Sequence, residues 1–264
     1  MNQDAIRSKY LSDGHCFPIE AMSPEQAAHY RDAFLRLEPE IDASGARRGG
    51  QLNQSHVILK FVNEITRNAK ILDAVEAVLG PNLLVWGSTF FIKEPRSTGF
   101  VSWHQDLHYW GLDKPDGMVS AWLALGPVTK ENGCMQFVSG SQTLGDLPHK
   151  DFFDENNFLY RGQQAQTEID PAQVVDVELK AGEFSLHHGY LLHASPANRS
   201  DIRRWGLTIN YISADNRQIV SDEDYAMLVR GHDTGGHFKP VTDPVEDLSP
   251  DAVALHGRII DAKD

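Results

Sequence analysis

Cysteine is scarce in this chain of 264 residues, in which only Cys16 and Cys134 occur. The two lie far apart and form no Cys-x-x-Cys pair, so the sequence predicts neither a disulfide framework nor a thiolate zinc site. We expect both side chains to be buried, because an unreactive cysteine behaves as a small apolar residue.

Long apolar runs and basic clusters are also missing. No stretch approaches the roughly 18 apolar residues that cross a bilayer. Residues 1–7 lack the apolar centre of a signal peptide, and residues 262–264 are not a peroxisomal address. The formal net charge is −13, and no Lys/Arg cluster with interleaved aromatics counters it. We therefore expect a cytoplasmic protein whose partners are neither membranes nor nucleic acids.

Two helices are predicted in the first third of the chain. Residues 23–26, Ser-Pro-Glu-Gln, have an N-cap serine, a proline at the first helical position and a glutamine that can complete a capping box. We expect this helix to reach about Leu37. Apolar residues spaced by three and four between 71 and 79 predict a second helix, which Gly80 closes.

Short strands dominate the sequence after residue 82. The expected strands cover residues 83–93, 119–128, 135–138, 175–179, 183–187 and 205–212. Early helices followed by many short strands predict a mainly β fold with flanking helices, namely a double-stranded β-helix, or cupin-like jelly roll.

One domain is expected over residues 1–264, because the length needs no second core and no linker interrupts the chain. It would comprise a helical N-terminal part at about 1–80, a jelly-roll core at about 83–213 and a C-terminal tail at 214–264. The polar stretch 140–173 is long for a plain loop, which favours a substrate lid. The tail could also fold over the mouth of the jelly roll.

The most informative motif is His104-Gln105-Asp106, and far downstream His193 is a candidate to join it. In an extended strand, residues two apart face the same side, so His104 and Asp106 can reach one metal ion together. With His193 as the third ligand, two imidazoles and one carboxylate form the ligand set of non-haem Fe(II) oxygenases.

An arginine pair follows this motif at the start of an apolar run. An inward arginine there needs an anionic partner, and the distal carboxylate of 2-oxoglutarate would supply one. Strand alternation allows only one of Arg203 and Arg204 to point inward.

Three segments together resemble the phytanoyl-CoA dioxygenase family of Fe(II)/2-oxoglutarate-dependent oxygenases, over about residues 8–240. They are residues 104–109, residues 121–122 with 131–134, and residues 193–195 through Arg204. The resemblance implies a jelly roll that uses Fe(II), 2-oxoglutarate and O2.

Roles for individual residues follow from the resemblance. The family spacing favours Arg204 as the partner of 2-oxoglutarate, and Ser195, Trp122 and Thr89 match positions near that cosubstrate. Halogenating relatives replace the carboxylate ligand with a small residue. Because Asp106 is intact, the expected reaction is hydroxylation of an unactivated C–H bond, with release of succinate and CO2.

The primary substrate is less well defined. Gln105, His108, Tyr109 and Trp110 follow the first ligand closely and are candidates to border its pocket. A small metabolite is the first expectation, because no basic cluster is available for the phosphates of an acyl-CoA thioester. Acyl-CoA hydroxylation and a non-oxidative, cupin-like metal-binding protein are the alternatives. The oligomeric state and the site of hydroxylation stay open.

Overall fold

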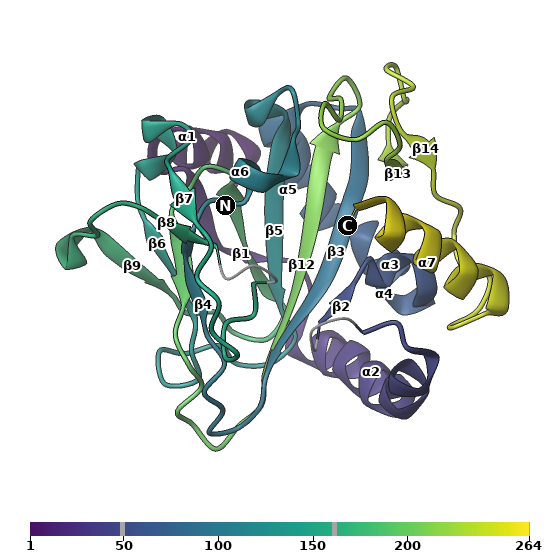
Figure 1. The fold of residues 1–264 in the computed structure, drawn as a ribbon, viewed down its shortest axis with the longest axis horizontal. Helices are drawn as coiled ribbons and strands as arrows, with labels where there is room; N and C mark the ends of the chain where they lie inside the picture. The colour runs from purple at the N-terminus through teal and green to yellow at the C-terminus, as the bar shows by residue number, and fades with distance from the viewer. Residues whose placement is uncertain (48–50, 160–162, 264) are drawn as a thin grey trace.

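The computed structural model describes residues 1–47, 51–159 and 163–263. Two β-sheets face each other, and helices cover the outer side of the larger one (Figure 1). The large sheet has, in spatial order, β1 (His15–Glu20), β10 (Glu183–His188), β5 (Met118–Ala124), β12 (Arg204–Ser213), β3 (Leu83–Lys93), β13 (Tyr225–Arg230) and β14 (Lys239–Pro240), with β2 (Leu52–Asn53) paired to β3. This is the jelly roll with flanking helices that the sequence predicts.

The small sheet lies across from the large one and contributes the other half of the jelly roll (Figure 1). Its strands are β4 (Val101–His104), β11 (His193–Ser195), β6 (Met135–Val138) and β9 (Val174–Val177). Antiparallel pairing of β4 with β11 sets His104 directly opposite His193. The pairing therefore joins two segments that lie far apart in the sequence.

Side-chain alternation on β12 explains how one strand serves both the core and the site. Trp205, Leu207, Ile209 and Tyr211 are buried in the core that the helices share with the large sheet. Arg204, Thr208 and Asn210 line a cavity on the opposite face. A period of two thus places apolar residues beneath the helices and polar residues toward the small sheet.

The two predicted helices are present as α2 and α5, and the described residues form five further helices that the sequence did not predict. The helices are α1 (Gln3–Asp13), α2 (Pro24–Ser44), α3 (Ser55–Ile58), α4 (Lys60–Thr66), α5 (Ala69–Leu79), α6 (Leu107–Trp110) and α7 (Pro250–Lys263). The Ser23 side chain accepts from the Gln26 N–H, as expected of an N-cap, and Gly80 caps α5. The prediction that α2 ends near Leu37 is wrong, because the last turns are held by buried Ile41 and by Glu38, which binds Arg203.

Both ends of the chain take part in the large sheet, which the sequence-based subdivision did not anticipate. β1 lies inside the predicted helical part and pairs with β10. β13 lies inside the predicted tail and pairs with β3. The jelly roll therefore extends beyond residues 83–213. The expected strand 119–128 ends earlier, at Ala124, whereas the predicted limits of β3 and β6 are correct.

The stretch 140–173 contains short elements rather than a plain loop. They are the 3-10 turns Ser141–Leu144 and Pro171–Gln173 and the paired strands β7 (His149–Lys150) and β8 (Gln164–Ala165). A further 3-10 turn, Pro115–Gly117, precedes β5. Residues 160–162, in the predicted lid, lie outside the described residues. Among the helices that the structure describes, none is long and apolar enough to cross a membrane.

Candidate active site

Two histidines from neighbouring strands of the small sheet present the same ring nitrogen to one point. His104 ends β4 and His193 begins β11, and their ring centroids lie 4.0 Å apart. Nδ1 of His104 lies 2.8 Å from the Ser102 carbonyl oxygen, and Nδ1 of His193 lies 2.9 Å from that of Leu191. Because a carbonyl oxygen only accepts, each Nδ1 carries the proton, which leaves Nε2 as a free ligand atom.

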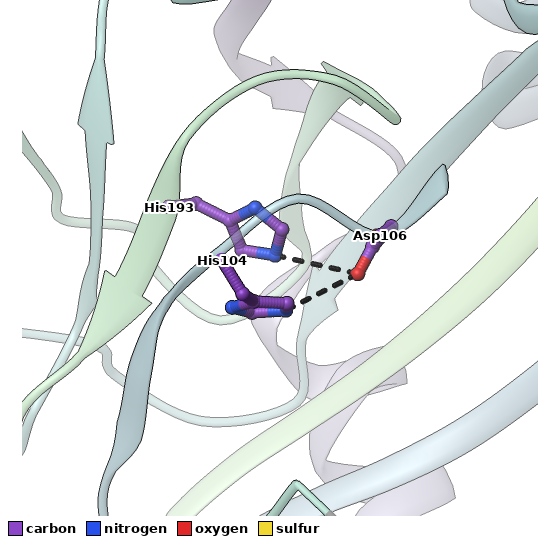
Figure 2. A group of neighbouring side chains, drawn as sticks. All are labelled: His104, Asp106 and His193. Atoms are coloured by element: carbon purple, nitrogen blue, oxygen red, sulfur yellow. Dashed lines mark ion pairs between the residues drawn. The ribbon is translucent and has the colours of Figure 1, made fainter. Parts of the chain in front are cut away.

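Asp106 completes the triad but not from a strand. β4 ends at His104, and Asp106 has helical backbone angles directly before α6. The prediction that both ligands extend from one strand is therefore wrong, because the chain turns after His104. Figure 2 shows both imidazoles directed at one oxygen of Asp106, with Oδ1 lying 3.2 Å from Nε2 of His104 and 3.6 Å from Nε2 of His193.

The charge states of the triad suit a divalent metal. Burial opposes the ionisation of Asp106, but His193, His104 and His187 together hold the pKa of its carboxyl well below the usual range. Burial, with His104 adding to it, lowers the pKa of His193 to about 3, so its imidazole is neutral. One carboxylate with two imidazole nitrogens matches the ligand preference of Fe(II), and these three residues would hold it.

His187 supports the ligand carboxylate from the large sheet, a contact that no sequence motif indicated. Its Nε2 lies 3.7 Å from Oδ2 of Asp106, and Ser120 Oγ lies 3.3 Å from the same oxygen. His187 and Ser120 are directly paired across β10 and β5. Oδ2 of Asp106 thus lies beside His187 and Ser120 of the large sheet, while Oδ1 faces His104 and His193.

Arg204 places a buried, positively charged side chain in the cavity. It is 1% exposed, and its Nη1 donates to the Gly133 carbonyl oxygen and to Ser195 Oγ. Nη2 makes a single long bond of 3.4 Å to the Phe91 carbonyl oxygen, and the buried Nε has no partner in the described part of the chain. The Nε/Nη2 edge therefore suits a carboxylate that binds with both oxygens, such as the distal one of 2-oxoglutarate.

Arg203 points the other way, as strand alternation requires. It pairs with Glu38 and Glu94 at the surface and stacks over Trp205. Of the two candidates, only Arg204 lines the cavity.

The other predicted cosubstrate residues all line the cavity. Trp122 lies over the Arg204 guanidinium at 5.3 Å, and its ring occupies the space beside Gly206, where a Cβ would come within 2.0 Å of it. Ser195 donates its only proton to the Gly133 carbonyl oxygen, so it holds Arg204 in place instead of donating to a carboxylate. Thr89 donates to Asn53 Oδ1 at 2.9 Å.

Lys93 is a second buried basic side chain that the sequence did not reveal. It pairs with Arg204 across β3 and β12 and is 0% exposed. Its Nζ donates to the Ser195 hydroxyl at 2.6 Å and to the carbonyl oxygens of Ser195 and Pro196. Burial, and then the neighbouring Arg204, lower the pKa of Lys93 to about 6.

The predicted substrate residues are divided between the cavity and its surroundings. The cavity measures about 1140 Å³, and Tyr109 and Trp110 line it. Gln105 also borders it, but its amide is used by the Gly145 and Tyr190 carbonyl oxygens and the Leu147 N–H. This residue therefore tethers a neighbouring segment and is not a free substrate contact.

His108 is not part of the cavity lining and belongs to a half-buried group with Asp146 and His149. Its Nδ1 bonds Asp146 at 2.6 Å, and its ring stacks on that of His149. Both ring nitrogens of His149 are occupied, by the Gln105 N–H and the Leu147 carbonyl oxygen. The group is thus held by its own hydrogen bonds, and the structure places His108 outside the cavity lining.

Parts of the predicted lid and tail do border the cavity. Residues 153–155, 157–159 and 163 line one side, and Asp224, Ile260 and Lys263 line another. Lys263, on α7, pairs with Asp224 at 3.1 Å and lies over the Trp86 ring at 3.7 Å. The C-terminal helix therefore forms a wall of the cavity.

The jelly roll thus brings into one cavity a triad of the kind that holds iron in non-haem oxygenases and an arginine whose Nε/Nη2 edge is free to bind a carboxylate. The family model of phytanoyl-CoA dioxygenase (PhyH) matches residues 10–206. The chain belongs to this family.

Individual relatives agree with this assignment. A probable alpha-ketoglutarate-dependent hypophosphite dioxygenase of Stutzerimonas stutzeri is 26% identical over 70% of this chain and 65% of its own length. Human peroxisomal phytanoyl-CoA dioxygenase is 30% identical over 55% of this chain and 44% of its own length. The chain thus spans less than two thirds of these curated relatives. A solved structure of the non-heme monooxygenase ThoJ, in apo form, is 32% identical, with a TM-score of 0.89 over 98% of this chain and 95% of that one.

Proposed function

We propose that the protein hydroxylates an unactivated C–H bond of a small molecule. The overall reaction consumes 2-oxoglutarate, O2 and the substrate R–H, and it yields succinate, CO2 and R–OH. One oxygen atom enters succinate and the other enters the product. The observation that supports this most strongly is the presence of the triad and the open edge of Arg204 in the same cavity.

Each protein group has a defined task in this reaction. His104, His193 and Asp106 would hold Fe(II), which, when bound with 2-oxoglutarate and O2, supplies the oxidising chemistry. Arg204 binds the distal carboxylate of 2-oxoglutarate and so orients its keto acid end toward the triad. Trp122 packs against the guanidinium and keeps water away from that charge pair. His187 lies beside the ligand carboxylate and helps to hold its orientation.

Hydroxylation is favoured over halogenation because a carboxylate occupies the third ligand position and leaves less room for chloride. The alternatives are hydroxylation of an acyl-CoA thioester and a non-oxidative, cupin-like metal-binding protein. The non-oxidative protein is disfavoured because it would give Arg204 no carboxylate to bind. We further propose that nucleic acid is not a partner, because a net charge of −13 repels phosphate backbones.

The test measures succinate release by Fe(II)-loaded protein under air, with 2-oxoglutarate and a panel of metabolites. We expect 2-oxoglutarate-dependent succinate release that at least one metabolite stimulates, together with a product heavier by one oxygen atom. A matched sample loaded with Zn(II), which does not change oxidation state, should be inactive. No binding of 2-oxoglutarate by the Mn(II)-loaded protein would favour the non-oxidative alternative.

A further inference from the structure

Gly87 leaves an opening in the cavity-facing side of the large sheet. It lies within β3, pairs with Asn210 of β12 and lines the cavity. A Cβ at Gly87 would lie 3.5 Å from Asn210 Nδ2 and 3.5 Å from Gln54 Nε2. The missing side chain therefore leaves two amide nitrogens bordering one bare stretch of backbone. We refer to Gly87, Asn210 and Gln54 as the amide patch.

The two amides of the patch are available as donors. Asn210 Oδ1 accepts from Ser120 Oγ at 3.0 Å, whereas no hydrogen bond from Asn210 Nδ2 is found within the described ranges. Gln54 Nε2 makes one long bond of 3.4 Å, to the Trp86 carbonyl oxygen. Both side chains line the cavity, so their N–H groups can donate to a ligand that supplies an oxygen atom.

The patch adjoins the metal triad. Ser120 Oγ lies 3.0 Å from Asn210 Oδ1 and 3.3 Å from Asp106 Oδ2. A single hydroxyl group thus separates the amide patch from the ligand carboxylate. Arg204 lies at the other end of β12 from Asn210, so 2-oxoglutarate on the arginine leaves the patch to the primary substrate.

Charges on the cavity wall disfavour an anionic substrate. Apart from the triad residues and Arg204, the Asp, Glu, Lys and Arg side chains in the described lining are those of Asp154, Glu155, Asp224 and Lys263. Lys263 is already paired with Asp224. A substrate carboxylate or phosphate would lose its hydration without gaining a free cation and would face two further acids.

Aromatic rings complete the cavity wall. Trp86, Tyr109, Trp110, Phe153 and Phe158 all line it. The cavity volume of about 1140 Å³ is ample for a molecule with an apolar body beside 2-oxoglutarate.

We propose that the amide patch binds a neutral oxygen acceptor of the primary substrate, which carries an aromatic or aliphatic body and no anionic group. This inference rests on the proposed function and narrows it. It excludes coenzyme A thioesters and free carboxylic acids as primary substrates.

Three probes that share one carbon skeleton test whether the site rejects anionic substrates. They are 4-phenylbutanamide, 4-phenylbutanoate and the coenzyme A thioester of 4-phenylbutanoic acid. Binding is measured by equilibrium dialysis without oxygen, on protein saturated with Mn(II) and 2-oxoglutarate. We expect the amide to bind at least about tenfold more tightly than the carboxylate, and the thioester not to bind. Equal or tighter binding of either anionic probe, or no binding of the amide, would overturn the proposal.

Gly87→Val and Gly87→Ala test whether the amide probe binds at the amide patch. Valine should fill the patch and weaken amide binding at least about tenfold, while the affinities for Mn(II) and 2-oxoglutarate stay unchanged. Alanine places only a Cβ at ordinary contact distance, so it keeps the fold and should have an intermediate effect. Gly257→Ala, where a Cβ meets nothing within 4 Å, is the matched control.

This experiment distinguishes failure of the amide-patch assignment from failure of the proposed function. If wild-type protein does not bind 2-oxoglutarate, the proposed function is wrong. If it binds 2-oxoglutarate but Gly87→Val binds the amide as wild type does, the assignment of the amide patch is wrong and the proposed function stands.

Discussion

Removal of the Arg204 guanidinium should abolish tight binding of 2-oxoglutarate without disturbing the metal triad. The side chain is 1% exposed, and its Nε/Nη2 edge is the one cationic surface of the described cavity lining without a carboxylate partner. Loss of a buried, charge-assisted pair costs about 2 to 5 kcal/mol, which corresponds to roughly 30-fold to several-thousand-fold in affinity. Arg204→Lys should recover only part of this, because an ammonium group lacks the planar fork.

The assay is a titration of 2-oxoglutarate into Fe(II)-loaded protein without oxygen. Arg203→Ala is the matched control, because this neighbouring arginine is directed at Glu38 and Glu94 outside the cavity. We expect the control to bind 2-oxoglutarate nearly as wild type does, and iron affinity to be similar in all variants. Equal affinity of wild type and Arg204→Ala for 2-oxoglutarate would refute the cosubstrate site.

Three further predictions concern the proposed metal ligands and the buried Lys93. His104→Ala and His193→Ala should give folded protein, by circular dichroism, without iron-dependent succinate release, and turnover with metal bound would contradict the triad. Asp106→Gly should weaken iron binding in a metal titration and abolish hydroxylation, whereas undiminished hydroxylation would show that the carboxylate is not a ligand. Burial and Arg204 lower the pKa of Lys93 from 10.5 to about 6, so the unfolded chain binds one more proton between these values and stability should rise with pH across this window. The free energy of unfolding is measured by urea unfolding at about pH 7 and about pH 9, and Lys93→Met should reduce its increase with pH by up to about 1.4 kcal/mol per pH unit. An unchanged dependence on pH would contradict the lowered pKa of Lys93.

Local sequence was sufficient for much of the scaffold. Strands β3 and β6 have the predicted limits, because alternating or continuous apolar runs end at turn residues. Helix α5 is correct because its apolar spacing and Gly80 act within the segment itself. Where tertiary contacts extend an element, the prediction was wrong, as at the last turns of α2, which Glu38 and Ile41 hold in place.

The sequence by itself also identified the chemistry of the site. His104, Asp106, His193 and Arg204 were recognisable because residue type and order along the chain indicate a metal ligand set and an anion partner. The backbone conformation between His104 and Asp106 was not recognisable, because the chain leaves the strand after His104 and Asp106 lies at the start of a helix.

Only the tertiary structure decided what surrounds those residues. His187 of the large sheet supports Asp106, which follows a strand of the small sheet. Lys93 lies beside Arg204, and Gly87 exposes the amide of Asn210, because β3 pairs with β12. The register of such pairs depends on which strands become neighbours and on where their ladders begin, and neither is written in the local pattern of a single strand. The residues that we propose for the chemistry could thus be read along the chain, whereas the shape and charge of the substrate pocket arise only when the sheets come together.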